Sequence, residues 1–181
     1  MCPSFRSSPV ANPNRPSKTV RLEINIADQT ATLFDDSGQR VRRYPVSTAL
    51  NGAGEVAGSY RTPRGRHVVR AKIGGGAAPG TVFSRRRPTG EICTPEAYER
   101  NPGRDWILTR ILWLSGLEPG RNRLGDRDTM RRFIYIHGTP DEVVLGIPGS
   151  RGCVRMRNRD IVELFDLLPC YGEVEIVEGK P

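Results

Sequence analysis

The chain has 181 residues and a net charge of +8, and all but three of its 28 basic residues are arginine, since lysine occurs only at Lys18, Lys72 and Lys180. This length fits one domain with a short appendage. With 20 glycines, 15 prolines, 36% apolar and 27% charged residues, the composition predicts a loop-rich globular protein and excludes a fibrous one. No run of about 18 apolar residues is present, so we expect no membrane span.

The charge pattern and the N-terminus bear on partners and location. Arginine grips carboxylates and phosphates, but the chain shows no nucleic-acid module and no basic stripe interleaved with aromatic residues. We therefore expect no nucleic-acid partner. Residues 1–19 lack the apolar run of a signal peptide. This predicts a cytoplasmic protein, or a periplasmic one if the true N-terminus is missing from the sequence.

Four cysteines, Cys2, Cys93, Cys153 and Cys170, form no CxxC pair, and the chain has only two histidines. This spacing does not match a zinc site, so we expect no metal and no cofactor. A chain without an export signal keeps its thiols reduced. We therefore expect four free thiols.

The N-terminal half predicts an arm followed by strands. Residues 1–18 are rich in Pro, Ser, Asn and Arg without periodicity, which indicates a disordered arm, and residues 19–181 show no further domain boundary. Between Thr19 and Thr48 three short stretches rich in β-branched residues are separated by turn signals, as in a β-meander. The alternation of apolar and polar residues over 20–26 fits a strand with one buried face.

The rest of the chain predicts further strands and one clear helix. Strands are expected at 67–73, 106–114, 133–136 and 172–178. Residues 74–104 are long for a structureless connection, so they form either a functional loop or lid or a mobile surface insertion. A helix follows Asn158, its expected N-cap, and stops at Pro169. The fold class is mainly β with one or two helices.

One segment carries recognisable chemistry: a strand delivers His137, and Cys153 follows 16 residues later beside Gly152. An ordinary thiol is only a few per cent thiolate at neutral pH, so cysteine catalysis needs an imidazole base, which His137 can supply. Gly152 would let a substrate approach closely, and the N–H groups of Gly152 and Cys153 could hold an oxyanion, at roughly 3 kcal/mol per donor. Arg155 could hold a substrate carboxylate, depress the thiol pKa, or pack against the following helix.

These residues resemble the L,D-transpeptidase family, the YkuD-like catalytic domain, whose hallmark is His-Gly after a strand and then Ser-His-Gly-Cys-x-(Arg/Asn). This chain has His-Gly-Thr at 137–139 and Ser-Arg-Gly-Cys-Val-Arg-Met at 150–156, and Thr-Pro-Arg-Gly at 62–65 is similar to a second family pattern. The resemblance covers about Thr19 to Val177. It implies a β-sandwich-like fold with the cysteine in a cleft under a lid, an imidazole oriented by a carbonyl close to Gly138, and chemistry at a diaminopimelate–D-Ala amide.

Several roles stay open. Arg151 replaces the family's histidine, which puts the acceptor preference in doubt more than the nucleophilic attack. Arg151, Arg155, Ser150 and Tyr135 are candidate substrate contacts, although Tyr135 is equally well explained as core. Residues 85–87, three arginines, fit a solvated charge run better than a peptide-gripping lid. His67, Cys2, Cys93 and Cys170 are expected to have no site role.

Three functions remain. The first is an L,D-transpeptidase that acylates Cys153 at the diaminopimelate carbonyl and passes the acyl group to an amine. The second is an L,D-carboxypeptidase in which water resolves the same acyl-enzyme during cell-wall recycling. The third is a non-catalytic peptidoglycan- or peptide-binding module. The expected partners are peptidoglycan stem peptides or free muropeptides, and the sequence leaves the oligomeric state open.

Overall fold

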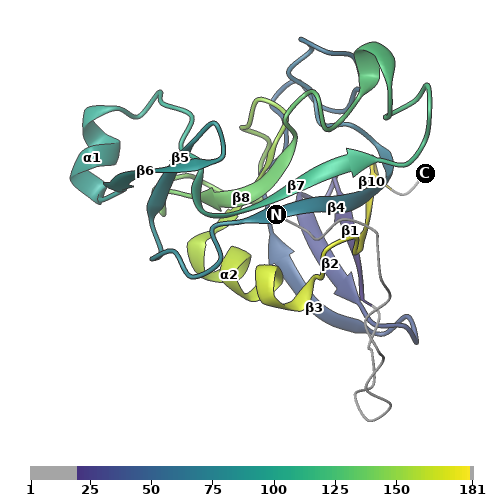
Figure 1. Ribbon diagram of the computed structural model, residues 1–181, viewed down its shortest axis with the longest axis horizontal. Coiled ribbons are helices and arrows are strands. Elements are labelled where there is room, and N and C mark those ends of the chain that lie inside the picture. Colours follow the sequence, from purple (N-terminus) through teal and green to yellow (C-terminus); the bar gives the residue numbers. More distant parts are fainter. Residues whose placement is uncertain (1–19, 180–181) are drawn as a thin grey trace.

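The computed structural model describes residues 20–179, so the predicted arm at 1–18 lies outside the described residues. The strands are β1 (Arg21–Asn25), β2 (Thr30–Phe34), β3 (Arg40–Pro45), β4 (Gly65–Ile73), β5 (Thr81–Ser84), β6 (Arg87–Ile92), β7 (Leu108–Gly116), β8 (Tyr135–Thr139), β9 (Val154–Arg157) and β10 (Glu173–Val177). The helices are α1 (Pro95–Arg100) and α2 (Asn158–Leu167), with a 3-10 turn at Gly125–Arg127. The predicted mainly β fold with one or two helices is confirmed (Figure 1).

One curled sheet joins all ten strands. Its order is β3-β2-β1-β10-β4-β7-β5-β6, and β8 pairs with β7 and β9, so the sheet branches at β7. β1 runs parallel to β10 and β8 parallel to β9, whereas the other neighbours are antiparallel. The two layers expected of a sandwich therefore come from a single sheet that curls.

The main core fills the space inside the curl and under α2. It holds the alternate residues Leu22, Ile24, Leu33, Leu112, Leu114, Ile136, Val154, Met156, Ile161, Leu164, Val174 and Ile176, each at most 1% exposed. The predicted alternation in β1 is confirmed, because Leu22 and Ile24 point inward while their neighbours are partly exposed. β7 is almost wholly buried, as its apolar sequence predicts for a central strand.

Some predicted boundaries shift for local reasons. β8 begins at Tyr135 and not at 133, because Phe133 has a positive φ of 57° that a strand cannot accommodate. The predicted N-cap role of Asn158 is wrong. Asn158 is the first residue of α2, its amide Nδ2 donates to Thr139 O (3.1 Å), and the capping position belongs to Arg157.

The stretch 74–104 is not a structureless connection. It forms the β5–β6 hairpin and α1, which with the residues up to β7 make an insertion projecting from the curled sheet (Figure 1). Val82, Ala97, Trp106 and Leu108 give this insertion a small core of its own. We call residues 74–107 the insertion.

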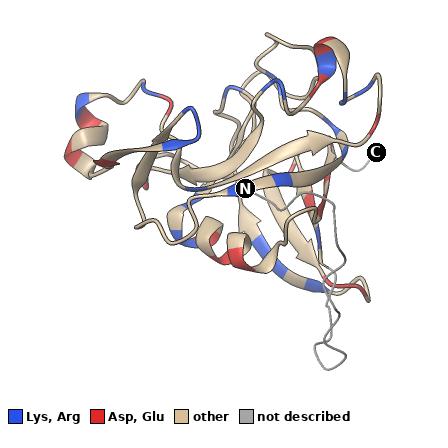
Figure 2. Cartoon of the chain, viewed as in Figure 1, with Lys and Arg blue, Asp and Glu red and all other residues tan. Residues whose placement is uncertain are grey.

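Basic residues are scattered over strands, loops and both helices, not gathered on one element (Figure 2). Within residues 20–179 no helix combines the length and apolar character needed to cross a membrane.

Candidate active site

The parallel pair β8 and β9 brings the two predicted reactive residues to one face of the sheet. Ile136 pairs with Val154 and His137 with Arg155. Because side chains alternate along a strand, Ile136 and Val154 enter the core, whereas His137, Arg155 and the preceding Cys153 face the other way. The register of these two strands therefore places the thiol and the imidazole on the same face of the sheet.

The loop before Cys153 is held by buried hydroxyl groups. Ser150 Oγ accepts from Gly152 N–H (3.2 Å) and donates to Cys153 O (2.5 Å). Thr62 Oγ1 donates to Gly152 O (3.0 Å), which ties the Thr-Pro-Arg-Gly segment to this loop. Gly152 has a φ of +125°, and an added Cβ would lie 3.1 Å from Ile134 Cδ1, so only glycine fits without strain.

The Cys153 thiol is neutral in this arrangement. Sγ donates toward Phe133 O (3.4 Å) and accepts from Tyr135 N–H (3.4 Å). The residue keeps some exposed surface, but the surrounding protein shields the sulfur, and this desolvation raises the thiol pKa to about 12. The Tyr135 N–H, Arg155 and Arg132 lower the pKa by smaller amounts, and Asp105 adds to the increase.

His137 is fully buried, with Nδ1 2.8 Å from Gly138 O. A carbonyl only accepts, so Nδ1 carries the proton and Nε2 presents its lone pair. Nε2 is buried and has no hydrogen-bond partner within residues 20–179, which for a polar atom is costly unless it serves a purpose. Burial lowers the pKa of His137, so the resting imidazole is neutral.

Close packing requires a glycine at position 138, in addition to the role of its carbonyl beside the imidazole. A Cβ at this position would lie 2.4 Å from Asn158 Oδ1 and 2.8 Å from Leu108 O. The carbonyl expected to orient the imidazole is thus that of Gly138 itself, and its backbone is fixed between β7 and α2.

The predicted pair of oxyanion donors is only half free. The expectation that Gly152 N–H is available is wrong, because this group donates to Ser150 Oγ. Cys153 N–H has no hydrogen-bond partner among the described residues. One backbone donor beside the thiol therefore remains for a developing oxyanion.

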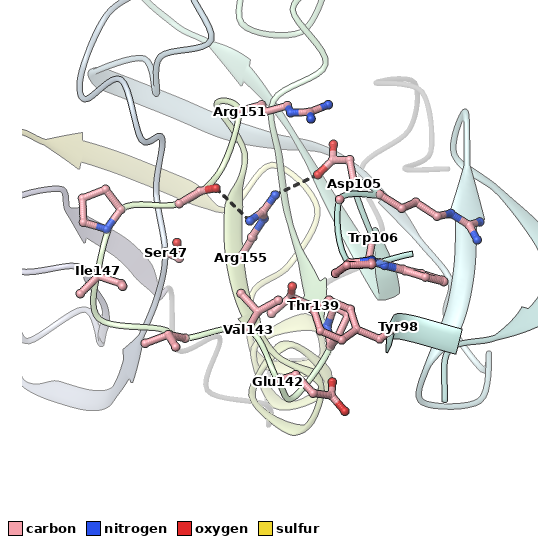
Figure 3. Close-up of a pocket in the computed structure, with 17 residues that line it drawn as sticks. Ser47, Tyr98, Asp105, Trp106, Thr139, Glu142, Val143, Ile147, Arg151 and Arg155 are labelled. Carbon is pink, nitrogen blue, oxygen red and sulfur yellow. Dashed lines mark hydrogen bonds and ion pairs between the residues drawn. The ribbon is translucent and has the colours of Figure 1, made fainter. Parts of the chain in front are cut away.

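Arg155 faces a cavity of about 420 Å³ instead of packing against α2. Its Nη2 lies 3.1 Å from Asp105 Oδ1, and its Nη1 donates to Gly149 O (3.0 Å) (Figure 3). The backbone of Arg155 exchanges two hydrogen bonds with Ser47, which fixes the strand beside the cavity. The cavity adjoins the reactive face, although Cys153 itself does not line it.

The remaining predicted contacts differ in their surroundings. Arg151 lines the 420 Å³ cavity and two others of about 290 and 280 Å³, and it forms no hydrogen bond or ion pair within the described chain. Ser150 is 3% exposed and uses its hydroxyl inside the loop. Tyr135 is buried and forms a wall, with its ring edge-on to Trp113 at 5.9 Å. Substrate binding by these three residues stays a prediction.

Sequence reasoning missed two residues of the insertion. Asp105 carried no signal, since only the fold brings it to Arg155. Arg86 was expected in a solvated charge run, which is wrong. It lies over the rings of Trp113 (4.5 Å) and Phe133 (5.0 Å) and donates to Tyr135 Oη (3.0 Å). The insertion therefore contacts the reactive face through Asp105 and Arg86, and also through Phe83, which packs in one apolar cluster with Tyr135 and Cys153.

The other candidates fall outside the site. Within residues 20–179, no three His, Cys, Asp or Glu side chains are grouped so as to hold a metal. Cys93 and Cys153 are free, but Cys170 is disulfide-bonded, so the expectation of four free thiols is wrong at that position. His67 is buried between Gly65 O (2.9 Å) and Thr129 Oγ1 (3.1 Å), away from the reactive face.

The chain is similar to known proteins over most of its length. The family model of the L,D-transpeptidase catalytic domain, YkuD, matches residues 19–176. The YkuD protein of Bacillus subtilis is 32% identical over 82 residues, 45% of this chain and 40% of that protein. The ErfK/SrfK protein of Escherichia coli is 43% identical over 47 residues, 26% of this chain and 15% of that protein.

Solved structures share the fold. An L,D-transpeptidase from Mycobacterium smegmatis superposes with a TM-score of 0.52 at 19% identity, covering 88% of this chain and 59% of that one. Bd1075 of Bdellovibrio bacteriovorus gives a TM-score of 0.56 at 18% identity, with 90% and 49% covered. The match thus spans about half of these solved chains and less than half of the curated relatives.

Proposed function

The chain belongs to the L,D-transpeptidase catalytic-domain family, and on that premise we propose that it is a cysteine acyl-transfer enzyme acting on peptidoglycan stem peptides. The observation that carries the proposal is His137 Nε2, a buried lone pair without a partner on the face that also presents the Cys153 thiol. A buried acceptor that has no partner among the described residues, on the same sheet face as a neutral thiol, fits the role of a general base.

The first half-reaction follows from these two side chains. Cys153 Sγ turns from Phe133 O toward Nε2, gives up its proton and attacks the diaminopimelate carbonyl carbon of a tetrapeptide. The N–H of Cys153 stabilises the oxyanion. Collapse breaks the C–N bond, and the imidazolium returns its proton to the amine of the departing D-Ala. The product is a thioester on Cys153.

The second half-reaction decides between two enzymes. An amine acceptor resolves the thioester by transpeptidation, and water resolves it by hydrolysis, as in an L,D-carboxypeptidase. The disulfide at Cys170 supports transpeptidation, because disulfides persist in oxidising compartments and crosslinking takes place outside the cytoplasm. A periplasmic or surface location is therefore the proposal that accompanies it.

Mass spectrometry of the enzyme with a diaminopimelate tetrapeptide tests the function. We expect loss of D-Ala, a thioester adduct on Cys153, and an exchanged product when a D-amino acid is added. Cys153→Ala and His137→Gln should be folded and inactive. Tripeptide alone, with no exchange, would identify the carboxypeptidase. Unchanged turnover in Cys153→Ala would overturn the cysteine mechanism of both enzymes. No turnover and no adduct in the unsubstituted chain would leave a binding module.

A further inference from the structure

We propose that Asp105 occupies a carboxylate-binding subsite formed by Arg155 and Arg151, and that a carboxylate of the substrate displaces it. The inference rests on the proposed function for the ligand, a peptide carboxylate. Asp105 would then be a built-in competitor that the insertion places in the subsite while the enzyme is empty.

The contact between Asp105 and Arg155 is of a kind that exchanges readily. A single oxygen, Oδ1, meets a single nitrogen, Nη2, at 3.1 Å, and the Asp105 side chain is 40% exposed while that of Arg155 is 16% exposed. The strong form of this pairing is bidentate and shielded from water, whereas single partly exposed ion pairs contribute little to stability. The other edge of Arg155 stays fixed on Gly149 O, so the guanidinium keeps its place if Asp105 leaves.

The cavity beside this pair holds a spare positive charge. Its charged lining residues are Arg104, Asp105, Glu142, Arg151 and Arg155. Arg104 is paired with Glu91 (3.0 Å) and lies over Trp106 (4.1 Å), so it is already satisfied. Arg151 has no partner within residues 20–179, and Figure 3 shows it on the side of the cavity near Asp105, opposite Glu142. A carboxylate that replaced Asp105 would meet two arginines.

The subsite lies at the distance that a stem peptide needs. Arg155 is two residues beyond Cys153 on the same face of the strand, about 6.6 Å along it. A peptide whose carbonyl sits on the thiol can place a carboxylate of the same or the adjacent residue there. Two groups of the stem peptide could supply this carboxylate: the terminal carboxylate of D-Ala and the side-chain carboxylate of diaminopimelate.

The test measures protection of Cys153 from iodoacetamide, followed by peptide mass spectrometry of the full chain. Cys93 in the same molecules is the internal reference, because it is free and belongs to the insertion. N-acetyl-D-alanine and meso-diaminopimelate are the two carboxylate ligands, and N-acetyl-D-alaninamide is the uncharged control. The assay needs no turnover, so its outcome is independent of whether the acyl-transfer proposal survives.

A competitor role and a merely structural role of Asp105 predict opposite changes in the ligand concentration that half-protects Cys153. If Asp105 competes, Asp105→Asn lowers the half-protecting ligand concentration by roughly threefold to tenfold, the effect of removing one nearby charge. If Asp105 merely positions Arg155, the same change raises that concentration. Asp36→Asn, an exposed turn substitution far from the cavity, should change nothing, and Arg151→Gln should weaken protection.

The ligand that tightens more in Asp105→Asn identifies the source of the carboxylate. Asp105→Ser repeats the comparison without an amide that could itself bind Arg155, and unchanged Cys93 labelling shows that the insertion is folded. Equal or weaker protection by both ligands in both variants would overturn the proposal. Equal tightening by the uncharged control would overturn it as well.

Discussion

The protonation state of the resting site can be tested directly. A thiol with a pKa of about 12 is roughly 3,000-fold less ionised at pH 7.5 than one with an ordinary pKa near 8.5. The greater nucleophilicity of a more basic thiolate recovers roughly 40-fold of this. We therefore expect iodoacetamide to label Cys153 about 100-fold more slowly than an exposed cysteine peptide, with a rate that rises between pH 6 and 10 without a plateau.

The variant His137→Gln distinguishes a resting site with a neutral thiol and a neutral imidazole from one with a thiolate and an imidazolium. Nε2 makes no hydrogen bond to the resting thiol, so removing the imidazole should leave the labelling rate of Cys153 within about twofold. Turnover should fall at least 100-fold, since the general base is lost. A labelling plateau near neutral pH that disappears in His137→Gln would refute this reasoning, because it would reveal a preformed thiolate and imidazolium.

Three further predictions concern the scaffold. Burial lowers the pKa of His67 to about 4, so its protonation favours the unfolded chain, and stability should fall by about 2 kcal/mol from pH 7 to pH 5. Urea unfolding of His67→Gln should show a correspondingly smaller fall, and an equal fall would contradict this assignment. Gly138→Ala should cost about 1–3 kcal/mol in thermal unfolding because of its backbone clash, whereas Gly103→Ala, with open space around it, should not. Arg86→Ala should speed amide exchange in the hairpin 81–92 roughly fivefold, equivalent to about 1 kcal/mol of lost stacking and hydrogen bonding, and unchanged exchange would show that the contact is idle.

The burial pattern of single strands and the motif around Cys153 could be predicted from the sequence. The alternation in β1 and the apolar run of β7 indicated which faces are buried, and the motif around His137 and Cys153 indicated two residues that the structure brings to one face of the sheet. The availability of Gly152 N–H was predicted wrongly, because a serine two residues earlier competes for that donor. Such a short turn leaves no trace in periodicity.

Contacts made by the insertion could not be predicted in the same way. Asp105 and Arg155 lie 50 residues apart and meet because the loop that carries Asp105 leads into β7, and β8 pairs with both β7 and the Arg155 strand, β9. The sequence placed Arg86 in a solvated charge run, but its guanidinium packs over two aromatic rings, Trp113 and Phe133, from separate segments. Both depend on tertiary packing that no sequence window contains.

The proposed reactive residues and the proposed carboxylate subsite lie on parts of the fold with different rigidity. The thiol, the imidazole and the Gly138 carbonyl are set by strand pairing and by a backbone with no room for a methyl group. The proposed carboxylate subsite is bounded by Asp105 of the insertion, which meets Arg155 through a single ion pair whose side chains are 40% and 16% exposed, respectively. Contacts of this second kind cost little to break. Strand pairing and close packing therefore constrain the proposed nucleophile and base, whereas the Asp105–Arg155 contact can change without altering them.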